Sequence, residues 1–201
     1  MHEKITQAIA QFTRLNQDDP RLLTPSKEED SEQKEMAKEV LFAQRLARWV
    51  HKLSPQPSSA LQLAAHCQHL QRWTMPRVDF PAGRVGYLKW RKDLAKMHAA
   101  LAQKVLTTLH FSEKLIQEVQ AINLKQDLHG NPDVQLMEDA LCLSFLEYEF
   151  IDFCDKQVDD EKVINIVRKT WGKMSDNAHQ VALNLPMRGR PQTLIAQALA
   201  P

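Results

Sequence analysis

The spacing of apolar residues predicts helices along most of the chain. In the first segment they recur at intervals of three or four, at Ile5, Ile9, Phe12 and Leu15. Asp18-Asp19-Pro20 ends this helix, and the polar stretch at residues 25–30 predicts a linker that is mobile in part. A second long helix is predicted from about residue 31 to residue 53, because its apolar residues form one stripe opposite a face of Glu and Lys.

Helix starts and breaks divide the rest of the chain. Pro55 and Pro57 interrupt it, and Ser58 or Ser59 can cap the next helix. Ser112 and Asn131-Pro132 begin two more. The predicted helices cover residues 60–73, 87–109, 113–124, 132–155 and about 160–174 with an extension toward 185, and a short one follows residue 191. We therefore expect an all-α fold of seven to eight helices, forming one domain over residues 1–201 with an N-terminal helix and linker at 1–30 and a tail at 186–201.

Composition agrees with one globular domain. The chain has 201 residues, of which 43% are hydrophobic and 25% charged, and only five are glycine. Its net charge of +1 argues against a general nucleic-acid coat and against a strongly anionic membrane partner, although a local basic patch is compatible with it.

Cysteines and the N-terminus suggest a reducing compartment. Cys67, Cys142 and Cys154 lie inside helical patterns without zinc-knuckle or redox spacing, which predicts buried free thiols. The polar N-terminus does not resemble a signal peptide, and the sequence has no apolar run near the roughly 20 residues that span a bilayer. We expect a cytoplasmic protein that does not engage a membrane.

Histidines concentrate the candidate chemistry in residues 60–98. On the predicted helix His66 and His69 are three residues apart and share a face, which suits a metal ion, a phosphate or a carboxylate. The alternative is that one is exposed and the other is a satisfied core residue. His98 shares a face with apolar neighbours, so it is predicted to point inward. Asp139 lies in the most apolar helix, where a carboxylate requires either a functional role or an ion pair with the basic residues at 72–91.

A basic and aromatic set occupies the same region: Arg72, Arg77, Arg84, Lys89, Arg91, Trp73, Tyr87 and Trp90. Guanidinium groups bind phosphate with two parallel hydrogen bonds and aromatic rings stack on bases, so the set favours a phosphate-plus-base site. The alternative is a solvated basic face whose tryptophans anchor the loop. The sequence has no Gly-rich phosphate loop and no nucleophile elbow.

Several segments resemble one family over nearly the whole chain. They are Cys-Gln-His-Leu-Gln-Arg-Trp at 67–73, Pro-Arg at 76–77, Gly-Tyr-Leu-Lys-Trp-Arg at 86–91, Met-Glu-Asp-Ala at 137–140 and Lys-Thr-Trp-Gly-Lys-Met-Ser at 169–175. They are similar to a bacterial and fungal family known as domain of unknown function 4202. This resemblance implies no activity.

A remoter resemblance is to the HD superfamily of metal-dependent phosphohydrolases, which are all-helical and use scattered His and Asp ligands. The segments 96–106, 113–122 and 136–143 follow the order of those enzymes, which implies His98 as an accessory histidine and Asp139 as the final aspartate ligand. Other ligand positions of that pattern fall near Phe42, at Gln68-His69 and at Lys125. Neither Phe nor a charged Lys offers a lone pair, so the standard metal centre of that superfamily does not fit this sequence. The resemblance instead implies a rearranged metal site of His69, His98 and Asp139, with Glu39 or His66 as a further ligand.

Three hypotheses follow. The first is a diverged HD-like phosphohydrolase of nucleotides or other phosphate esters, in which His69, Asp139 and Arg72 are catalytic, and His69, His98 and Asp139 hold a divalent metal that activates water. Its phosphate-binding residues are Arg72, Arg77, Lys89 and Arg91. The second is a non-catalytic module that binds a phosphorylated small molecule, a nucleotide or an RNA end. The third is a protein adaptor that uses the Trp- and Arg-rich hairpin as its recognition surface.

Overall fold

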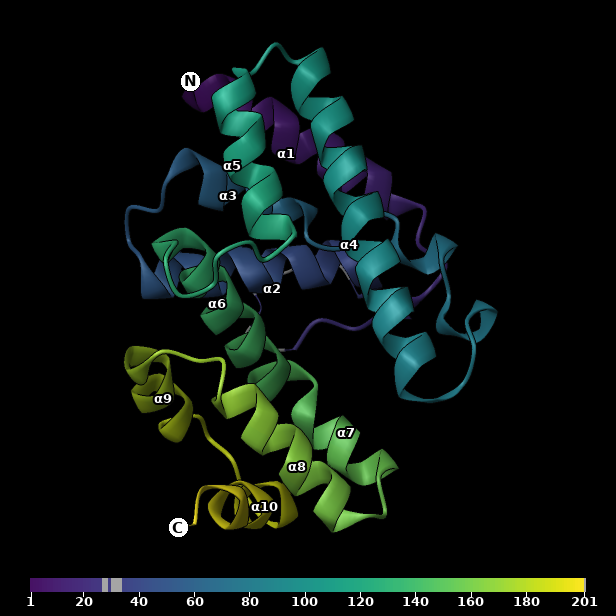
Figure 1. Ribbon diagram of the computed structural model, residues 1–201, viewed down its shortest axis with the longest axis vertical. Coiled ribbons are helices and arrows are strands. Elements are labelled where there is room, and N and C mark those ends of the chain that lie inside the picture. Colours follow the sequence, from purple (N-terminus) through teal and green to yellow (C-terminus); the bar gives the residue numbers. More distant parts are fainter. Residues whose placement is uncertain (27–28, 30–33, 201) are drawn as a thin grey trace. The chain divides into compact units, whose positions relative to one another are not determined.

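The computed structural model describes residues 1–26, 29 and 34–200. Within these residues it contains ten α-helices, two short 3-10 helices (η1 and η2) and one two-stranded antiparallel sheet (Figure 1). The prediction of a mainly helical protein is confirmed. The helix count is higher than predicted because two of the expected helices are each divided in two.

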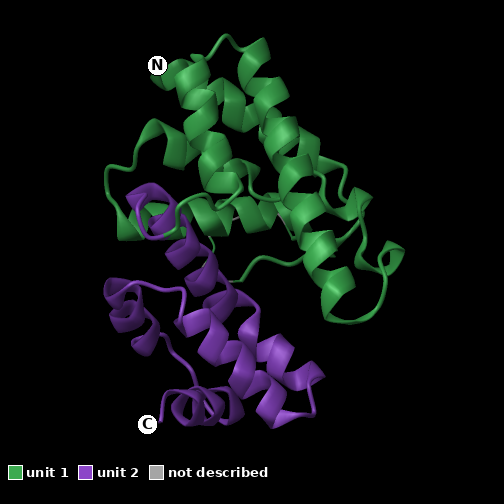
Figure 2. Cartoon of the chain, in the orientation of Figure 1, with its two compact units in different colours: residues 1–128 green, residues 129–201 purple. Residues whose placement is uncertain are grey.

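The chain divides into two compact units, residues 1–128 and residues 129–201 (Figure 2). Each has its own buried apolar residues, among them Phe12, Leu63 and Leu106 in unit 1 and Phe150 and Val163 in unit 2. A single domain over residues 1–201 stays a prediction of the sequence.

Unit 1 contains five α-helices, of which α3 is the most central. They are α1 (His2–Gln17), α2 (Lys38–Leu53), α3 (Ser59–Cys67), α4 (Gly83–Thr108) and α5 (Glu113–Asn123). Helix α3 packs against α1, α2 and α5, and α4 lies along α5 and α1 (Figure 1). Ser58 and Ser112 cap α3 and α5 with their hydroxyl oxygens, which confirms the predicted starts to within a residue.

The prediction of a helix from residue 31 is wrong at its N-terminal end. Residues 31–33 lie outside the described residues, as do residues 27, 28 and 30 of the expected mobile linker, and α2 begins only at Lys38. The preceding strand β2 (Met36–Ala37) pairs with β1 (Leu22–Leu23), and Lys38 N–H donates to the Arg21 carbonyl at 2.8 Å. The backbone before residue 38 is therefore held in extended pairing, which competes with helical hydrogen bonds.

The helix predicted over residues 60–73 ends at Cys67, and the 3-10 helix η1 (Arg72–Thr74) follows after a turn. Two tertiary hydrogen bonds hold this turn: the Gln68 amide donates to Asn123, and Gln71 N–H donates to the Asn16 side chain of α1. Gln71 adopts a φ of 51° there. His69 therefore lies beyond the helix, and the expected shared helix face of His66 and His69 is wrong.

Helix α4 begins four residues earlier than predicted, at Gly83, after the second 3-10 helix η2 (Arg77–Asp79). Gly86 is required in its first turns because a Cβ at this position would lie 1.9 Å from the Pro81 carbonyl oxygen. The loop therefore packs directly on the helix backbone. Further along α4, His98 is buried, as predicted.

Unit 2 contains α6 (Pro132–Tyr148), α7 (Phe150–Lys156), α8 (Asp160–Trp171), α9 (Asp176–Leu183) and α10 (Arg190–Leu199). The predicted cap at Asn131-Pro132 is confirmed, but the helix expected to reach residue 155 breaks at Glu149. Phe145 then contacts Phe150 and Phe153 edge-on across this break. Helix α8 likewise ends at Trp171, and Ser175 caps α9 as a separate helix.

The three cysteines are buried free thiols, as predicted. Among the helices described, none is long and apolar enough to cross a membrane.

Candidate phosphate-binding site

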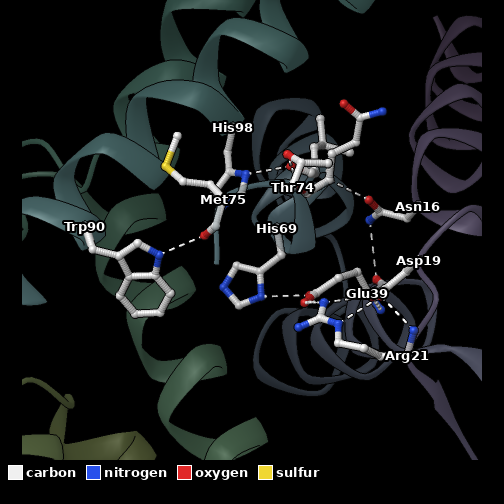
Figure 3. A network of polar contacts seen from close by, with 11 residues as sticks. Asn16, Asp19, Arg21, Glu39, His69, Thr74, Met75, Trp90 and His98 are labelled. Carbon is white, nitrogen blue, oxygen red and sulfur yellow. Dashed lines mark hydrogen bonds and ion pairs between the residues drawn. The ribbon is translucent and has the colours of Figure 1, made fainter. Parts of the chain in front are cut away.

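His69 is held rigidly in unit 1. Its Nδ1 contacts Glu39 Oε2 (Figure 3), at a distance of 3.1 Å. Its ring also stacks on Phe42, with centroids 4.0 Å apart and planes 12° apart. Phe42 lies near a position where the HD pattern has a histidine ligand. In this protein its ring instead fixes the plane of His69, a role that the sequence pattern did not reveal.

Glu39 is in turn oriented by the segment after α1. Arg21 donates from Nη2 to Glu39 Oε1 at 2.6 Å and makes two hydrogen bonds of 2.8 Å to Asp19 (Figure 3). The backbone N–H of Glu39 donates to Asp19 Oδ2 at 3.2 Å. Sequence analysis missed Asp19 and Arg21 because they lie in a polar segment with no periodicity, far along the chain from His69.

The protonation states at the site follow from burial and pairing. Burial opposes the charge of Glu39, but hydrogen bonds from His69 and Arg21 and the positive charge of Arg21 outweigh it and hold the pKa of Glu39 below its usual value. Burial lowers the pKa of His69 despite the neighbouring carboxylate. At neutral pH the site therefore contains a carboxylate and a neutral imidazole, so Nδ1–H of His69 donates to Glu39 and Nε2 carries the lone pair.

His98 repeats this arrangement with a backbone partner. Its Nδ1–H donates to the Leu70 carbonyl at 2.8 Å, and its ring centroid lies 5.7 Å from that of His69. Burial lowers its pKa to about 3, with help from the charges of neighbouring groups, so this imidazole is neutral at pH 7. Its buried Nε2 has no hydrogen-bond partner among the residues described.

Arg72 lies beside these imidazoles and stacks on an aromatic ring. Its guanidinium carbon is 4.8 Å from the Trp90 ring centroid, and Trp90 Nε1 donates to the Met75 carbonyl at 2.9 Å. The second contact confirms that Trp90 anchors the loop. Burial lowers the pKa of Arg72. The structure gives the Arg72 side chain no hydrogen bond or ion pair with any residue it describes, so five N–H donors are left for other partners.

The other predicted phosphate ligands differ in whether their side chains already have hydrogen-bond partners within the protein. Arg77 donates to the carbonyls of Phe80, Pro81 and Gly83, so it closes its own loop. Arg91 is exposed and donates to the Tyr87 hydroxyl at 3.2 Å. Lys89 is exposed on α4.

Asp139 belongs to unit 2, and its carboxylate is well hydrogen-bonded there. Oδ1 accepts from Ser175 N–H at 2.8 Å and from the Gln135 amide at 3.0 Å, and Oδ2 accepts from the Ser175 hydroxyl at 2.6 Å. Asp139 thus fixes the start of α9. In the described part of the chain, no three His, Cys, Asp or Glu side chains are gathered as metal ligands would be. The metal site of His69, His98 and Asp139 stays a prediction.

Comparison with known families gives one match, which extends over residues 6–195. The chain belongs to the family described as Domain of unknown function (DUF4202). Neither the curated proteins nor the solved structures include a significant match to this DUF4202 chain.

Proposed function

We propose that unit 1 binds a phosphate-bearing ligand with Arg72 as its anchor. The observation that carries this proposal is a partly buried guanidinium that stacks on Trp90 and has no anionic partner forming an ion pair with it among the described residues. A charge withdrawn from water and left unpaired is costly, so such a group is rarely retained without a partner.

A phosphate group suits this arrangement. Stacking on Trp90 holds the plane of the guanidinium, which leaves its forked N–H groups free to make two parallel hydrogen bonds to phosphate oxygens. The Glu39 carboxylate balances the charge of Arg72 in part, and Arg91 adds a second positive charge whose field reaches Arg72. An anion bound there relieves the repulsion between the two arginines, whereas a cation is disfavoured by both.

His69 would contribute a hydrogen-bond acceptor beside the bound anion. Because Glu39 fixes its tautomer, Nε2 can accept a hydrogen bond from a ligand hydroxyl or from a water molecule. A carboxylate–imidazole pair next to a bound phosphate can also act as a general base for hydrolysis of a phosphate ester, with water as the nucleophile, but the lowered pKa of His69 makes it a weak base. Binding is therefore the first property to test, and hydrolysis is the second.

The test is isothermal titration calorimetry with inorganic phosphate and with AMP on wild type, Arg72→Gln and Arg14→Gln. Arg14 is an exposed arginine of α1 and provides the matched control. We expect Arg72→Gln to weaken binding at least tenfold, since a charge-assisted hydrogen bond contributes about 1.5–3 kcal/mol, while Arg14→Gln binds like wild type. Equal affinity of wild type and Arg72→Gln for both ligands contradicts the proposal.

A second candidate is a metal-dependent phosphohydrolase with an HD-like fold. It is favoured by one observation: His69 and His98 both direct Nδ1 to an oxygen, which leaves Nε2 as the lone-pair nitrogen, as in histidines that bind metals. Metal analysis of the purified protein and thermal melts with Mn²⁺ or Zn²⁺ test it. We expect retained metal that His69→Asn loses; no bound metal and no shift in melting temperature rule this candidate out.

A further inference from the structure

One face of α4 combines five cations with two exposed aliphatic side chains. The helical repeat places on this face Arg84, Val85, Leu88, Lys89, Arg91, Lys92 and Lys96. All seven are exposed, with Val85 at 82% and Leu88 at 54%. Asp93, the single carboxylate of this stretch, is half-buried and lies off this face. We call these seven residues the α4 basic face.

Within the described residues, the charges of the α4 basic face are not neutralised. The structure gives Arg84, Lys89, Lys92 and Lys96 no ion pair or hydrogen bond from their side chains to the residues it describes. The whole chain has a net charge of only +1, so five cations without an interleaved anion are a strong local concentration. Such a surface attracts a polyanion from solution.

The α4 basic face adjoins the Arg72 site. Arg91 belongs to this face and also donates to Tyr87, whose ring lies 5.8 Å from the Trp90 ring. Trp90 carries the stacked guanidinium of Arg72. Cations and partly exposed aromatic rings therefore follow one another without interruption from α4 to the proposed phosphate anchor.

We propose that the ligand is a single-stranded nucleic acid whose terminal phosphate binds Arg72 and whose following phosphates lie along the α4 basic face. The inference rests on the proposed function and specifies its ligand. Cations that track a backbone, together with aromatic rings on which bases stack, are the usual components of single-strand binding. An anionic membrane surface is a poorer match, because interfacial helices bury a broad apolar face and this one has two aliphatic residues among five cations.

The length of the face sets the size of the strand. Arg84 and Lys96 are separated by about 18 Å along the helix, at 1.5 Å per residue. A stacked strand has one phosphate per ~3.4 Å, so about five phosphates match the whole face. Trp90, on which Arg72 stacks, lies midway between Arg84 and Lys96, so a mononucleotide bound at Arg72 reaches only the middle of this length. We therefore expect an oligonucleotide to bind more tightly than AMP, with a strong dependence on salt.

Fluorescence anisotropy with a fluorescent oligouridylate of about twelve nucleotides tests the proposal, using 5′-phosphorylated, 3′-phosphorylated and unphosphorylated forms. The key variant is the triple substitution Arg84→Gln/Lys92→Gln/Lys96→Gln. Each cation that contacts a single strand contributes about 0.7 to the slope of log K against log salt, so the variant should reduce that slope by about 2. Its affinity for AMP should be unchanged. Lys104→Gln, at the other end of α4, is the matched control and should behave like wild type.

The outcomes separate this inference from the proposed function. Arg72→Gln should lose AMP binding and the preference for a terminal phosphate, while it keeps the salt slope from α4. If the triple variant binds the oligonucleotide with wild-type affinity and slope, the inference fails although AMP binding at Arg72 stands. If the triple variant weakens oligonucleotide binding, but neither Arg72→Gln nor removal of the terminal phosphate does, then Arg72 is not the anchor of the strand. Sedimentation with phosphatidylserine vesicles that depends on α4, without oligonucleotide binding, would assign the face to a membrane instead.

Discussion

Because His98 is buried, the free energy of unfolding of unit 1 should depend on the protonation of this one side chain and therefore on pH. The unfolded chain binds a proton at this histidine near its ordinary pKa of 6.5, whereas burial holds the folded pKa at about 3. Because the folded state has the lower pKa, acid favours the unfolded state. The contribution of His98 to the free energy of unfolding is fully present above pH 6.5 and is lost as the pH falls toward 3.

The magnitude at pH 5 depends only on the unfolded pKa, provided the folded pKa lies well below 5. Protonation of the unfolded chain then lowers the free energy of unfolding by about 2 kcal/mol for one such histidine. His98→Asn removes the titrating group and keeps an N–H that can donate to the Leu70 carbonyl. The variant should be less stable than wild type at neutral pH, but its stability should change less between neutral pH and pH 5, by about 2 kcal/mol.

Urea denaturation of both proteins at pH 7.5 and pH 5, followed by tryptophan fluorescence, measures this difference. His110→Asn is the matched control, because His110 is exposed and its loss should leave the pH dependence like that of wild type. If His98→Asn and wild type lose the same free energy of unfolding on acidification, His98 is not buried as a neutral imidazole. That result would falsify the assignment of its lone pair to Nε2.

Three further substitutions test the packing around the candidate residues. Gly86→Ala should lower the free energy of unfolding by roughly 1–3 kcal/mol, although alanine favours helix, because its Cβ would lie 1.9 Å from the Pro81 carbonyl oxygen; a raised urea midpoint would contradict this close approach. Asp139→Ala should cost about 3 kcal/mol by urea denaturation, since it leaves the N–H and hydroxyl of Ser175 without their acceptor, and wild-type stability in that variant would refute the structural role. Ser112→Ala should cost about 1 kcal/mol through the lost cap of α5, and an unchanged thermal midpoint would show that the cap is dispensable.

Sequence periodicity identified most helices because it reports which face of each helix is apolar. The caps at Ser58, Ser112 and Asn131 were predictable as well, since a capping side chain bonds to backbone only two or three residues away. The inward position of His98 followed from its apolar neighbours on the same face. These features depend on interactions within one or two turns of helix.

Helix breaks and side-chain partners could not be predicted in the same way. The end of α3 at Cys67 depends on Asn16 and Asn123, which are more than fifty residues from the turn they hold. Phe42 and Glu39 likewise meet His69 only because α2 packs against α3. Long-range contacts of this kind leave no periodic signal in the sequence.

Local patterns were enough to establish that this protein is helical and that His69, Arg72 and Trp90 lie in its most chemically dense segment. The contacts of those residues depend on the tertiary structure. It removed His69 from the helix face of His66, gave it Glu39 and Phe42, and left Arg72 stacked on Trp90 without a carboxylate bound to it among the described residues. The physical reason is that local propensities act over one helical turn, whereas burial, tautomer and ion pairing depend on every element that packs around a side chain.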